Sequence, residues 1–142
     1  VLAKKKAESL MNEHPNDLII GSDQILVTSK GIINKPQNIS QAKDNLNFLS
    51  GKEHSLISSV YVIRSKKFFF EETKEALLFF RKISRAVIEE YVKENKKTAL
   101  SSVGSYKIEQ NKKYNFIKVI KGDQETIIGF PLKKLIKKLE KI

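Results

Sequence analysis

Helical and strand patterns alternate along these 142 residues, and this alternation predicts a protein of mixed α and β structure. The composition is that of a folded chain, because 40% of the residues are hydrophobic and 30% are charged. No internal repeat or low-complexity linker interrupts the sequence. We therefore expect one domain over residues 1–142, which is long enough to bury a substantial core.

The residue composition also excludes several classes of protein. The chain has no cysteine, so disulfides and thiolate chemistry are excluded and a reducing cytoplasm is the expected compartment. No apolar run approaches the roughly 20 residues that a membrane-spanning helix needs. The net charge of +11 suggests a polyanionic partner. Because nearly all of this charge is lysine spread along the chain, a solvated basic surface that attracts small polyanions is favoured over a nucleic-acid interface.

The first half of the chain is predicted to contain two helices and two strands. The helices are expected at residues 2–13 and 40–49, and the strands at residues 17–27 and 54–64. Ser40 is the expected cap of the second helix. No capping residue precedes the first helix, so we expect that a segment upstream of Val1 is missing.

The second half is predicted to contain four strands. Two are favoured within residues 68–81, although residues 76–80 are also consistent with part of a helix, because periodicity does not separate the two in so short a run. Two more strands are expected at residues 114–120 and 125–128. The two strands within residues 68–81 are favoured because Phe68, Phe69 and Phe70 are strongly β-prone. The turn between these two strands is expected near Glu71 and Glu72.

Two further helices complete the expected order of elements. Ser84 is the predicted cap of a helix that turns Val87, Ile88 and Tyr91 inward. Pro131 is expected to open a last helix, since proline favours the first turn. The apolar face of that last helix consists of Leu132, Leu135, Ile136 and Leu139. Because this face lacks bulky aromatic residues, packing on the sheet is favoured over binding to a membrane surface.

The most informative segment is an apolar run that passes through Gly21 and Ser22 and delivers one carboxylate, Asp23. Lys35 follows at the end of the next β-rich run. A carboxylate can hold a divalent cation or activate water, and an ammonium can neutralise a phosphate. The layout therefore predicts metal-assisted phosphate chemistry. The alternative is that Asp23 is an ordinary turn residue, which is the commoner role of such an aspartate.

A second polar group follows Gly104, whose lack of a side chain allows the backbone to approach a ligand. Lys107 and Glu109 would project to the same side of an extended segment. The alternative is an ordinary loop with a surface ion pair. His14 and His54 are isolated, which argues against a structural zinc site. Neither a Walker loop nor a dinucleotide-binding fingerprint occurs.

Short motifs follow one another in a fixed order along the whole chain. They are Leu2-Ala3 with Lys6-Ala7, Ile20-Gly21-Ser22-Asp23-Gln24, Lys35-Pro36, Leu49-Ser50-Gly51 with His54, Glu72-Thr73, Phe80-Arg81, Gly104-Ser105-Tyr106-Lys107, Gly122-Asp123 and Gly129-Phe130-Pro131-Leu132. Each motif is weak alone, but the ordered series is specific. It resembles the Maf family of nucleoside triphosphate pyrophosphatases.

The resemblance implies a Maf/ITPase-like α/β fold, in which helices flank an elongated mixed β-sheet with a deep nucleotide-binding cleft. It also implies a homodimer that hydrolyses a nucleoside triphosphate to the monophosphate and pyrophosphate. The implied cofactor is a divalent metal cation, Mg²⁺ or Mn²⁺. The implied role is the house-cleaning removal of non-standard or modified nucleotides in the cytoplasm.

The resemblance also assigns roles to single residues. Asp23 would accept the proton of the attacking water or help to hold the metal, and Lys6 and Lys35 would stabilise charge on the phosphates. Gln24 and Glu109 match positions that the family associates with base selection. The substrate-binding set that the resemblance implies is Ser22, Gln24, Lys107 and Glu109.

Gln24 and Glu109 are residue types that resemble those of the family branch that acts on 7-methyl-GTP. The branch that prefers dTTP and UTP usually has Thr at the position of Gln24 and Gln near the position of Glu109.

Two alternative functions stay open. One is a non-catalytic nucleotide-binding regulator of cell division, because the family is linked to septum formation, and the other is a basic nucleic-acid-binding domain. The chain departs from the family pattern at Asn34 and Phe130, which replace a glycine and a leucine. The family's N-terminal strand with its Ser-x-Arg-Arg motif is also missing, so we expect a truncated domain with weak or no activity.

Overall fold

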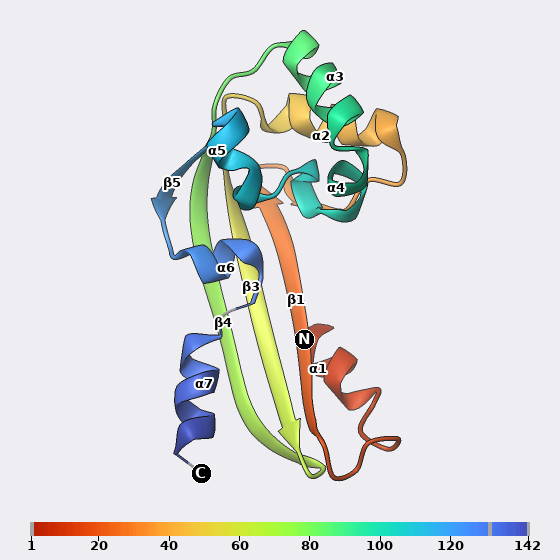
Figure 1. Cartoon of the computed structure of the whole chain (residues 1–142), viewed down its shortest axis with the longest axis vertical. Helices are drawn as coiled ribbons and strands as arrows, with labels where there is room; N and C mark the ends of the chain where they lie inside the picture. The colour runs from red at the N-terminus through yellow and green to blue at the C-terminus, as the bar shows by residue number, and fades with distance from the viewer. Residues whose placement is uncertain (1, 131, 142) are drawn as a thin grey trace. The chain divides into compact units, whose positions relative to one another are not determined.

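The computed structural model describes residues 2–130 and 132–141. Its elements, most of which are labelled in Figure 1, are α1 (Leu2–Glu8), β1 (Leu18–Thr28), β2 (Gly31–Ile33), α2 (Ile39–Leu49), β3 (Glu53–Arg64), β4 (Lys67–Phe80), α3 (Arg85–Glu94), α4 (Lys96–Ser101), α5 (Asn111–Tyr114), β5 (Ile117–Lys121), α6 (Gln124–Ile128) and α7 (Lys133–Glu140), with short 3₁₀ turns η1 (Val103–Ser105) and η2 (Ile108–Gln110). The described strands form one sheet in the order β2-β1-β3-β4-β5. The α/β class, with helices beside a sheet, is confirmed; the deep cleft stays a prediction.

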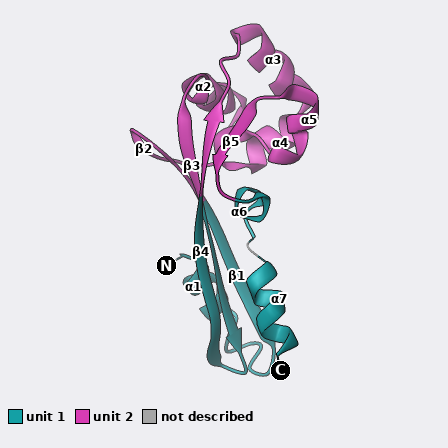
Figure 2. Cartoon of the chain, turned by 90° about the vertical axis from the view of Figure 1, so that its left-hand side faces the viewer, with its two compact units in different colours: residues 1–24, 57–75, 123–142 teal, residues 25–56, 76–122 magenta. Residues whose placement is uncertain are grey.

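Two compact units divide the chain (Figure 2). Unit 1 comprises residues 1–24, 57–75 and 123–142, and unit 2 comprises residues 25–56 and 76–122. The three long strands β1, β3 and β4 each contribute residues to both units. Each unit has its own apolar contacts and is described below by itself. The sequence predicts one domain over residues 1–142, whereas the structure contains two compact units. That the two units form a single domain stays a prediction.

Unit 1 buries side chains on both faces of its strands. On one face, Ala7 of α1 packs against Ile19 of β1 and Ile63 of β3. On the other face, Leu135 of α7 packs against Val60 and Val62 of β3. Because successive side chains of a strand point to opposite faces, Ile63 and Val62 assign α1 and α7 to opposite sides of the strands. The same arrangement is visible in Figure 2.

Unit 2 is built around a cluster of aromatic rings. Phe80, at the end of β4, contacts Phe116 at a ring separation of 5.4 Å and Tyr106 at 5.6 Å. Tyr91 of α3 meets Phe116 edge-on at 5.2 Å. His54 is 2% exposed and lies within 2.5 Å of the Tyr106 hydroxyl through its Nε2 atom. Edge-on and offset rings stabilise a core beyond the area that they bury.

The strand predictions hold for β1 and β3 and fail in two places. The expected turn at Glu71 and Glu72 is wrong, because β4 runs without interruption through both residues. No glycine, proline, asparagine or aspartate is present there to favour a turn. The expected strand at residues 125–128 is also wrong, because this segment is helix α6. Asp123 starts that helix by accepting a hydrogen bond from the Thr126 amide through its side chain.

The helix predictions need smaller corrections. α1 ends at Glu8, several residues before the expected end. The cap of α2 is Asn38 and not Ser40, since the Asn38 side chain accepts a hydrogen bond from the backbone N–H of Gln41. Ser84 caps α3 as predicted. Val87, expected to point inward, is 37% exposed.

The last helix packs on the sheet as predicted, with Leu135 only 1% exposed. Leu132 and Ile136, which were expected on the same apolar face, remain 38% and 42% exposed. The expected role of Pro131 in opening this helix lies outside the described residues. None of the described helices combines the length and the apolarity that crossing a membrane demands.

Buried His54 predicts a stability that depends on pH. Burial lowers the pKa of His54 from 6.5 to about 4. Between these pH values the unfolded chain binds a proton that the folded chain does not, so stability is complete above pH 6.5 and decreases as the pH falls towards 4. We expect the free energy of unfolding to lose about 3 kcal/mol over this range from His54 alone. Urea unfolding at several pH values measures it.

The control for this prediction is His54→Gln, which keeps a polar side chain beside Tyr106 but cannot titrate. Its unfolding free energy should be lower than that of the parent at pH 7 and should depend less on pH between 6.5 and 4. An equal pH dependence in the parent and in the variant would contradict the role of His54.

Candidate functional site

Asp23 lies on β1 at a point where α1 comes unusually close to the strand. A Cβ atom added to Gly21 would lie 2.1 Å from the backbone oxygen of Ala3 and 2.8 Å from the backbone nitrogen of Ala7. Ala3 and Ala7 are buried and occupy one side of α1, where side chains four residues apart align. Three small residues therefore let a helix and a strand approach to backbone contact beside Asp23.

This close approach brings Lys6 of α1 to Asp23. The Lys6 ammonium donates a hydrogen bond to Asp23 Oδ1 at 3.3 Å and another to the backbone oxygen of Ser22 at 3.0 Å. The Asp23 side chain is 20% exposed and that of Lys6 is 51% exposed. A partly exposed ion pair of this kind contributes little to stability. Its ammonium and its carboxylate remain accessible to a phosphate and to a cation.

The chemistry of Asp23 fits a divalent cation that is shared with a ligand. No group of three or more His, Cys, Asp or Glu residues able to hold a metal occurs within residues 2–130 and 132–141. Magnesium is usually bound through one or two carboxylates together with the phosphates of a substrate. Asp23 is a partly exposed carboxylate and can supply one such ligand.

Gln24 follows Asp23 on the strand and makes contacts with α6 instead of α1. Its amide nitrogen Nε2 donates to the backbone oxygens of Ile127 at 2.8 Å and Thr126 at 3.1 Å. The same nitrogen lies 3.2 Å from the Ser58 hydroxyl of β3. Adjacent residues of a strand point to opposite faces, which explains why Asp23 and Gln24 meet different helices.

A group of charged side chains that sequence reasoning missed lies on β4 and the segment after β5. Lys74 contacts Asp123 Oδ2 at 2.9 Å, and Glu72 Oε1 lies 3.2 Å from Lys134 of α7. The hydrogen bond from Lys74 and those from Thr126 hold the pKa of Asp123 well below its ordinary value. The bond to Asp123 in turn raises the pKa of Lys74. The available signal was Asp123 followed three residues later by Thr126, which is typical of a helix start.

The remaining predicted site residues belong to unit 2. Lys35 lies in the exposed loop after β2, and Lys107 is exposed with an extended backbone. Glu109 is exposed within η2. The structure therefore brings Lys6, Ser22 and Asp23 together in unit 1. Lys35, Lys107 and Glu109 are placed in the other unit.

The expectation that Lys107 and Glu109 share one side of an extended segment is wrong. Residues 108–110 form a 3₁₀ turn, so the segment that contains Glu109 is not extended.

The backbone before this turn is unusual at two consecutive residues, Gly104 and Ser105, which have positive φ angles of 72° and 64°. A Cβ at Gly104 would also lie 2.6 Å from the Leu26 side chain, so glycine is required there for both reasons.

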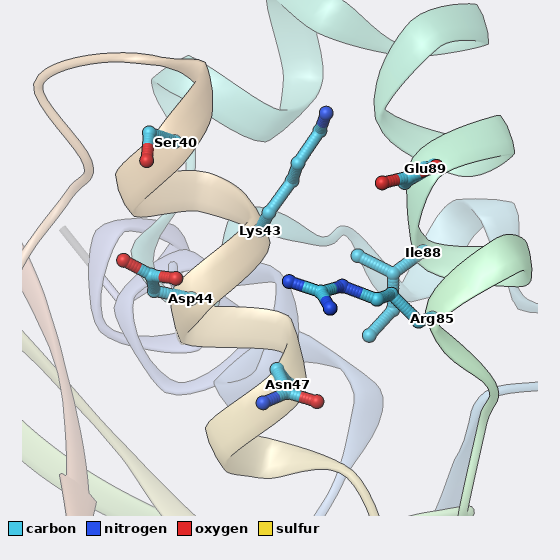
Figure 3. Close-up of a pocket in the computed structure, with 7 residues that line it drawn as sticks. All are labelled: Ser40, Lys43, Asp44, Asn47, Arg85, Ile88 and Glu89. Atoms are coloured by element: carbon cyan, nitrogen blue, oxygen red, sulfur yellow. The ribbon is translucent and has the colours of Figure 1, made fainter.

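A polar pocket between α2 and α3 was not expected from the sequence (Figure 3). It has a volume of about 250 Å³ and is lined by Ser40, Lys43, Asp44, Asn47, Arg85, Ile88 and Glu89. Arg85 reaches from α3 towards α2. The lining carries two basic and two acidic side chains, so its charge is balanced and it favours neither an anion nor a cation. None of the predicted site residues lines it.

Comparison with known proteins extends over the whole chain. The family model described as "Maf-like protein" matches residues 1–142. The chain is 36% identical over 142 residues, covering 100% of this chain and 71% of the relative, to a Rhizobium etli protein named 7-methyl-GTP pyrophosphatase. It is 37% identical over 135 residues, or 95% of this chain and 66% of the relative, to a nucleoside triphosphate pyrophosphatase of Rhodopseudomonas palustris. A Legionella pneumophila protein of the same name is 35% identical over 138 residues, covering 97% of this chain and 68% of the relative.

The backbone contact at Gly21 predicts that Gly21→Ala is destabilising. The added methyl group would meet the Ala3 oxygen and force α1 away from β1. We expect the free energy of unfolding to fall by about 1–3 kcal/mol, the usual range for overpacking. Urea unfolding measures this, with Ser22→Ala on the same strand as the control. A Gly21→Ala protein as stable as its parent would contradict the contact.

Proposed function

This chain belongs to the family of Maf-like proteins, and from that membership together with the Asp23–Lys6 pair we propose that it hydrolyses a nucleoside triphosphate to the monophosphate and pyrophosphate. The observation that carries the proposal is the paired carboxylate and ammonium beside Gly21, two groups that suit water activation and phosphate binding. The names of relatives at 35–37% identity over nearly the whole chain support the same reaction class.

In the proposed reaction, water breaks the bond between the α- and β-phosphates. Asp23 accepts the proton of the attacking water or holds the divalent cation, while Lys6 and Lys35 neutralise negative charge on the phosphates. The proton and the hydroxyl of water are thus distributed between the two products. Lys6 can exchange its bond to Asp23 for a phosphate oxygen, because its ammonium is half exposed.

A magnesium or manganese ion is the proposed cofactor, with Asp23 as its protein ligand. Such an ion supplies charge neutralisation and polarises the phosphoryl oxygens. The chain's own contribution is the position of Asp23, which the contact between α1 and β1 fixes on one side of the strand. We place the reaction in the cytoplasm and expect a homodimer to carry it out.

7-methyl-GTP is the proposed substrate, with dTTP and UTP next. The relative from Rhizobium etli carries the name 7-methyl-GTP pyrophosphatase, and Gln24 and Glu109 resemble the corresponding branch of the family. The proposed substrate-binding residues are Ser22, Gln24, Lys107 and Glu109.

Asp23→Asn tests the assigned catalytic role. The amide keeps the size of the side chain but can neither accept the proton of water nor hold a cation as a carboxylate does. We expect pyrophosphate release from 7-methyl-GTP, dTTP and UTP with Mg²⁺ or Mn²⁺ to fall at least 100-fold, with the melting temperature nearly unchanged. Turnover equal to that of the parent would exclude Asp23 from the reaction.

Lys6→Met tests the phosphate contact, and Lys5→Met is its matched control. Both lysines lie on α1, but only Lys6 is recorded in contact with Asp23 and Ser22. We expect kcat/KM to fall about 10- to 100-fold for Lys6→Met, since a charge near the transferring phosphate is lost. Lys5→Met should retain activity within about twofold. Equal losses in the two variants would mean that only the net positive charge of α1 matters, and would contradict a specific contact between Lys6 and a phosphate.

A further inference from the structure

The fold gathers basic side chains on one surface of unit 1. Helix α7 lies beside β4 (Figure 1), and Leu135 and Leu139 pack it against the β3–β4 hairpin. The two segments that form this surface are residues 64–72 and 133–141, and they carry eight basic side chains against three acidic ones, Glu71, Glu72 and Glu140. Their net charge of +5 is close to half of the +11 of the whole chain. Lysines that are spread along the sequence therefore form a local patch in the fold.

A groove between α7 and β4, here called the lysine groove, lies within this patch. It has a volume of about 390 Å³ and is lined by Phe70, Lys134, Lys137, Lys138 and Lys141. Lys134 and Lys138 are four residues apart, as are Lys137 and Lys141, so the ammonium groups follow the helix axis in two rows. The lining therefore contains four cations, one aromatic ring and no carboxylate.

Neighbouring acidic side chains neutralise little of the charge in the lysine groove. The Glu72 side chain is 9% exposed, and its Oε1 lies 3.2 Å from the Lys134 ammonium. For Lys137, Lys138 and Lys141, no ion pair is recorded among residues 2–130 and 132–141. Like charges four residues apart on a helix repel each other and destabilise it. A polyanion bound in the groove would relieve this repulsion and release its own counterions.

Aromatic rings lie beside these lysines. The Lys138 ammonium is 5.1 Å from the centre of the Phe69 ring and 6.0 Å from that of Phe70. Phe70 is half-buried, because it packs against the cluster of Val60, Val62 and Leu135 while it also lines the groove. In proteins that bind single-stranded nucleic acids, a positively charged groove follows the phosphates and bases stack on aromatic side chains. The lysine groove combines both features.

We propose that the lysine groove binds a single-stranded polynucleotide, with phosphates on Lys137, Lys138 and Lys141 and a base on Phe70. The lining has no arginine, which is the side chain that reads bases by paired hydrogen bonds, so the binding is independent of sequence. Phosphates and base faces are common to RNA and DNA, so both bind. A concave groove suits a chain molecule better than the flat surface of an anionic membrane. None of the proposed catalytic or substrate-binding residues lines the groove, so this inference does not depend on the proposed hydrolysis.

Fluorescence anisotropy of labelled oligo-dT and oligo-U, each of about 12 nucleotides, measures this binding with the full chain over a series of KCl concentrations. The test variant carries Lys137→Gln, Lys138→Gln and Lys141→Gln together. We expect its Kd at about 100 mM KCl to rise at least 10-fold for both strands. The slope of log Kd against log[KCl] should fall by about 2, because each lost contact with a phosphate of a single strand removes about 0.7. Lys137→Gln alone, with a slope lower by about 0.7, serves if the triple variant does not fold.

The matched control carries Lys82→Gln, Lys97→Gln and Lys118→Gln, three exposed lysines of unit 2. It loses the same charge as the test variant, and its Kd should rise less than about threefold, the effect of net charge alone. Equal losses of affinity in the two triple variants, or an unchanged salt slope in the test variant, would overturn the proposal.

Phe70→Leu tests the stacking contact, since leucine keeps an apolar side chain but has no aromatic face. We expect its Kd to rise about fivefold or more with the salt slope unchanged, because stacking is not ionic. Its control is Phe68→Ala: Phe68 is 60% exposed on the same hairpin, and its ring contacts Tyr61 at 5.4 Å. This control should keep the Kd within about twofold. Equal effects of the two substitutions would contradict a base on Phe70.

Sedimentation with vesicles of phosphatidylcholine and phosphatidylglycerol distinguishes a polynucleotide from a membrane. We expect little binding of the parent at the KCl concentration at which it binds both oligonucleotides. Strong binding to these vesicles that is lost in the triple lysine-groove variant, without measurable binding to the oligonucleotides, would assign the groove to a membrane and overturn the proposal.

Discussion

The packing of α1 on β1 at Gly21 is the constraint on which the proposed site depends. Helix and strand meet at backbone distance because Ala3, Ala7 and Gly21 present almost no side chain at the contact. Their approach leaves Lys6 within reach of the carboxylate of Asp23 and of the Ser22 carbonyl. A larger residue at any of the three positions would separate the elements. The geometry of the charged pair therefore originates in residues that carry no chemistry themselves.

Because side chains alternate along β1, the two faces of the strand contact different segments of the chain. Ile19 and Asp23 belong to the side that α1 covers, while Gln24 reaches Ser58 and α6. Two consecutive residues thus connect β1 to segments from opposite ends of the chain. In the proposed enzyme, one face supplies charge to the phosphates and the other supplies an oriented amide.

The local signals of the sequence predicted some elements well. The apolar run of β1 and the Ser84 cap of α3 depend on neighbouring residues, and both were predictable. The helix at residues 124–128 was missed because the β-branched run Thr126-Ile127-Ile128 favours a strand by propensity. In the structure the Asp123 side chain caps this segment as a helix by accepting a hydrogen bond from the Thr126 amide. β4 runs through Glu72, whose carboxylate contacts Lys134 of the distant α7, a contact that no local signal in the sequence indicates. Among the proposed site residues, the position of Asp23 on a strand directly after Gly21 and Ser22 was predictable from the sequence. Two partners of Gln24, the backbone oxygens of Thr126 and Ile127, lie 102 and 103 positions away, so these contacts follow from tertiary packing alone.

A crystal structure of this chain with Mg²⁺ and an α,β-methylene analogue of 7-methyl-GTP, which cannot be cleaved between those phosphates, would test the proposed site most directly. We predict a phosphate oxygen within hydrogen-bonding distance of the Lys6 ammonium and the metal ion on the Asp23 carboxylate. A nucleotide seated in the polar pocket between α2 and α3, with Lys6 still paired to Asp23, would contradict it.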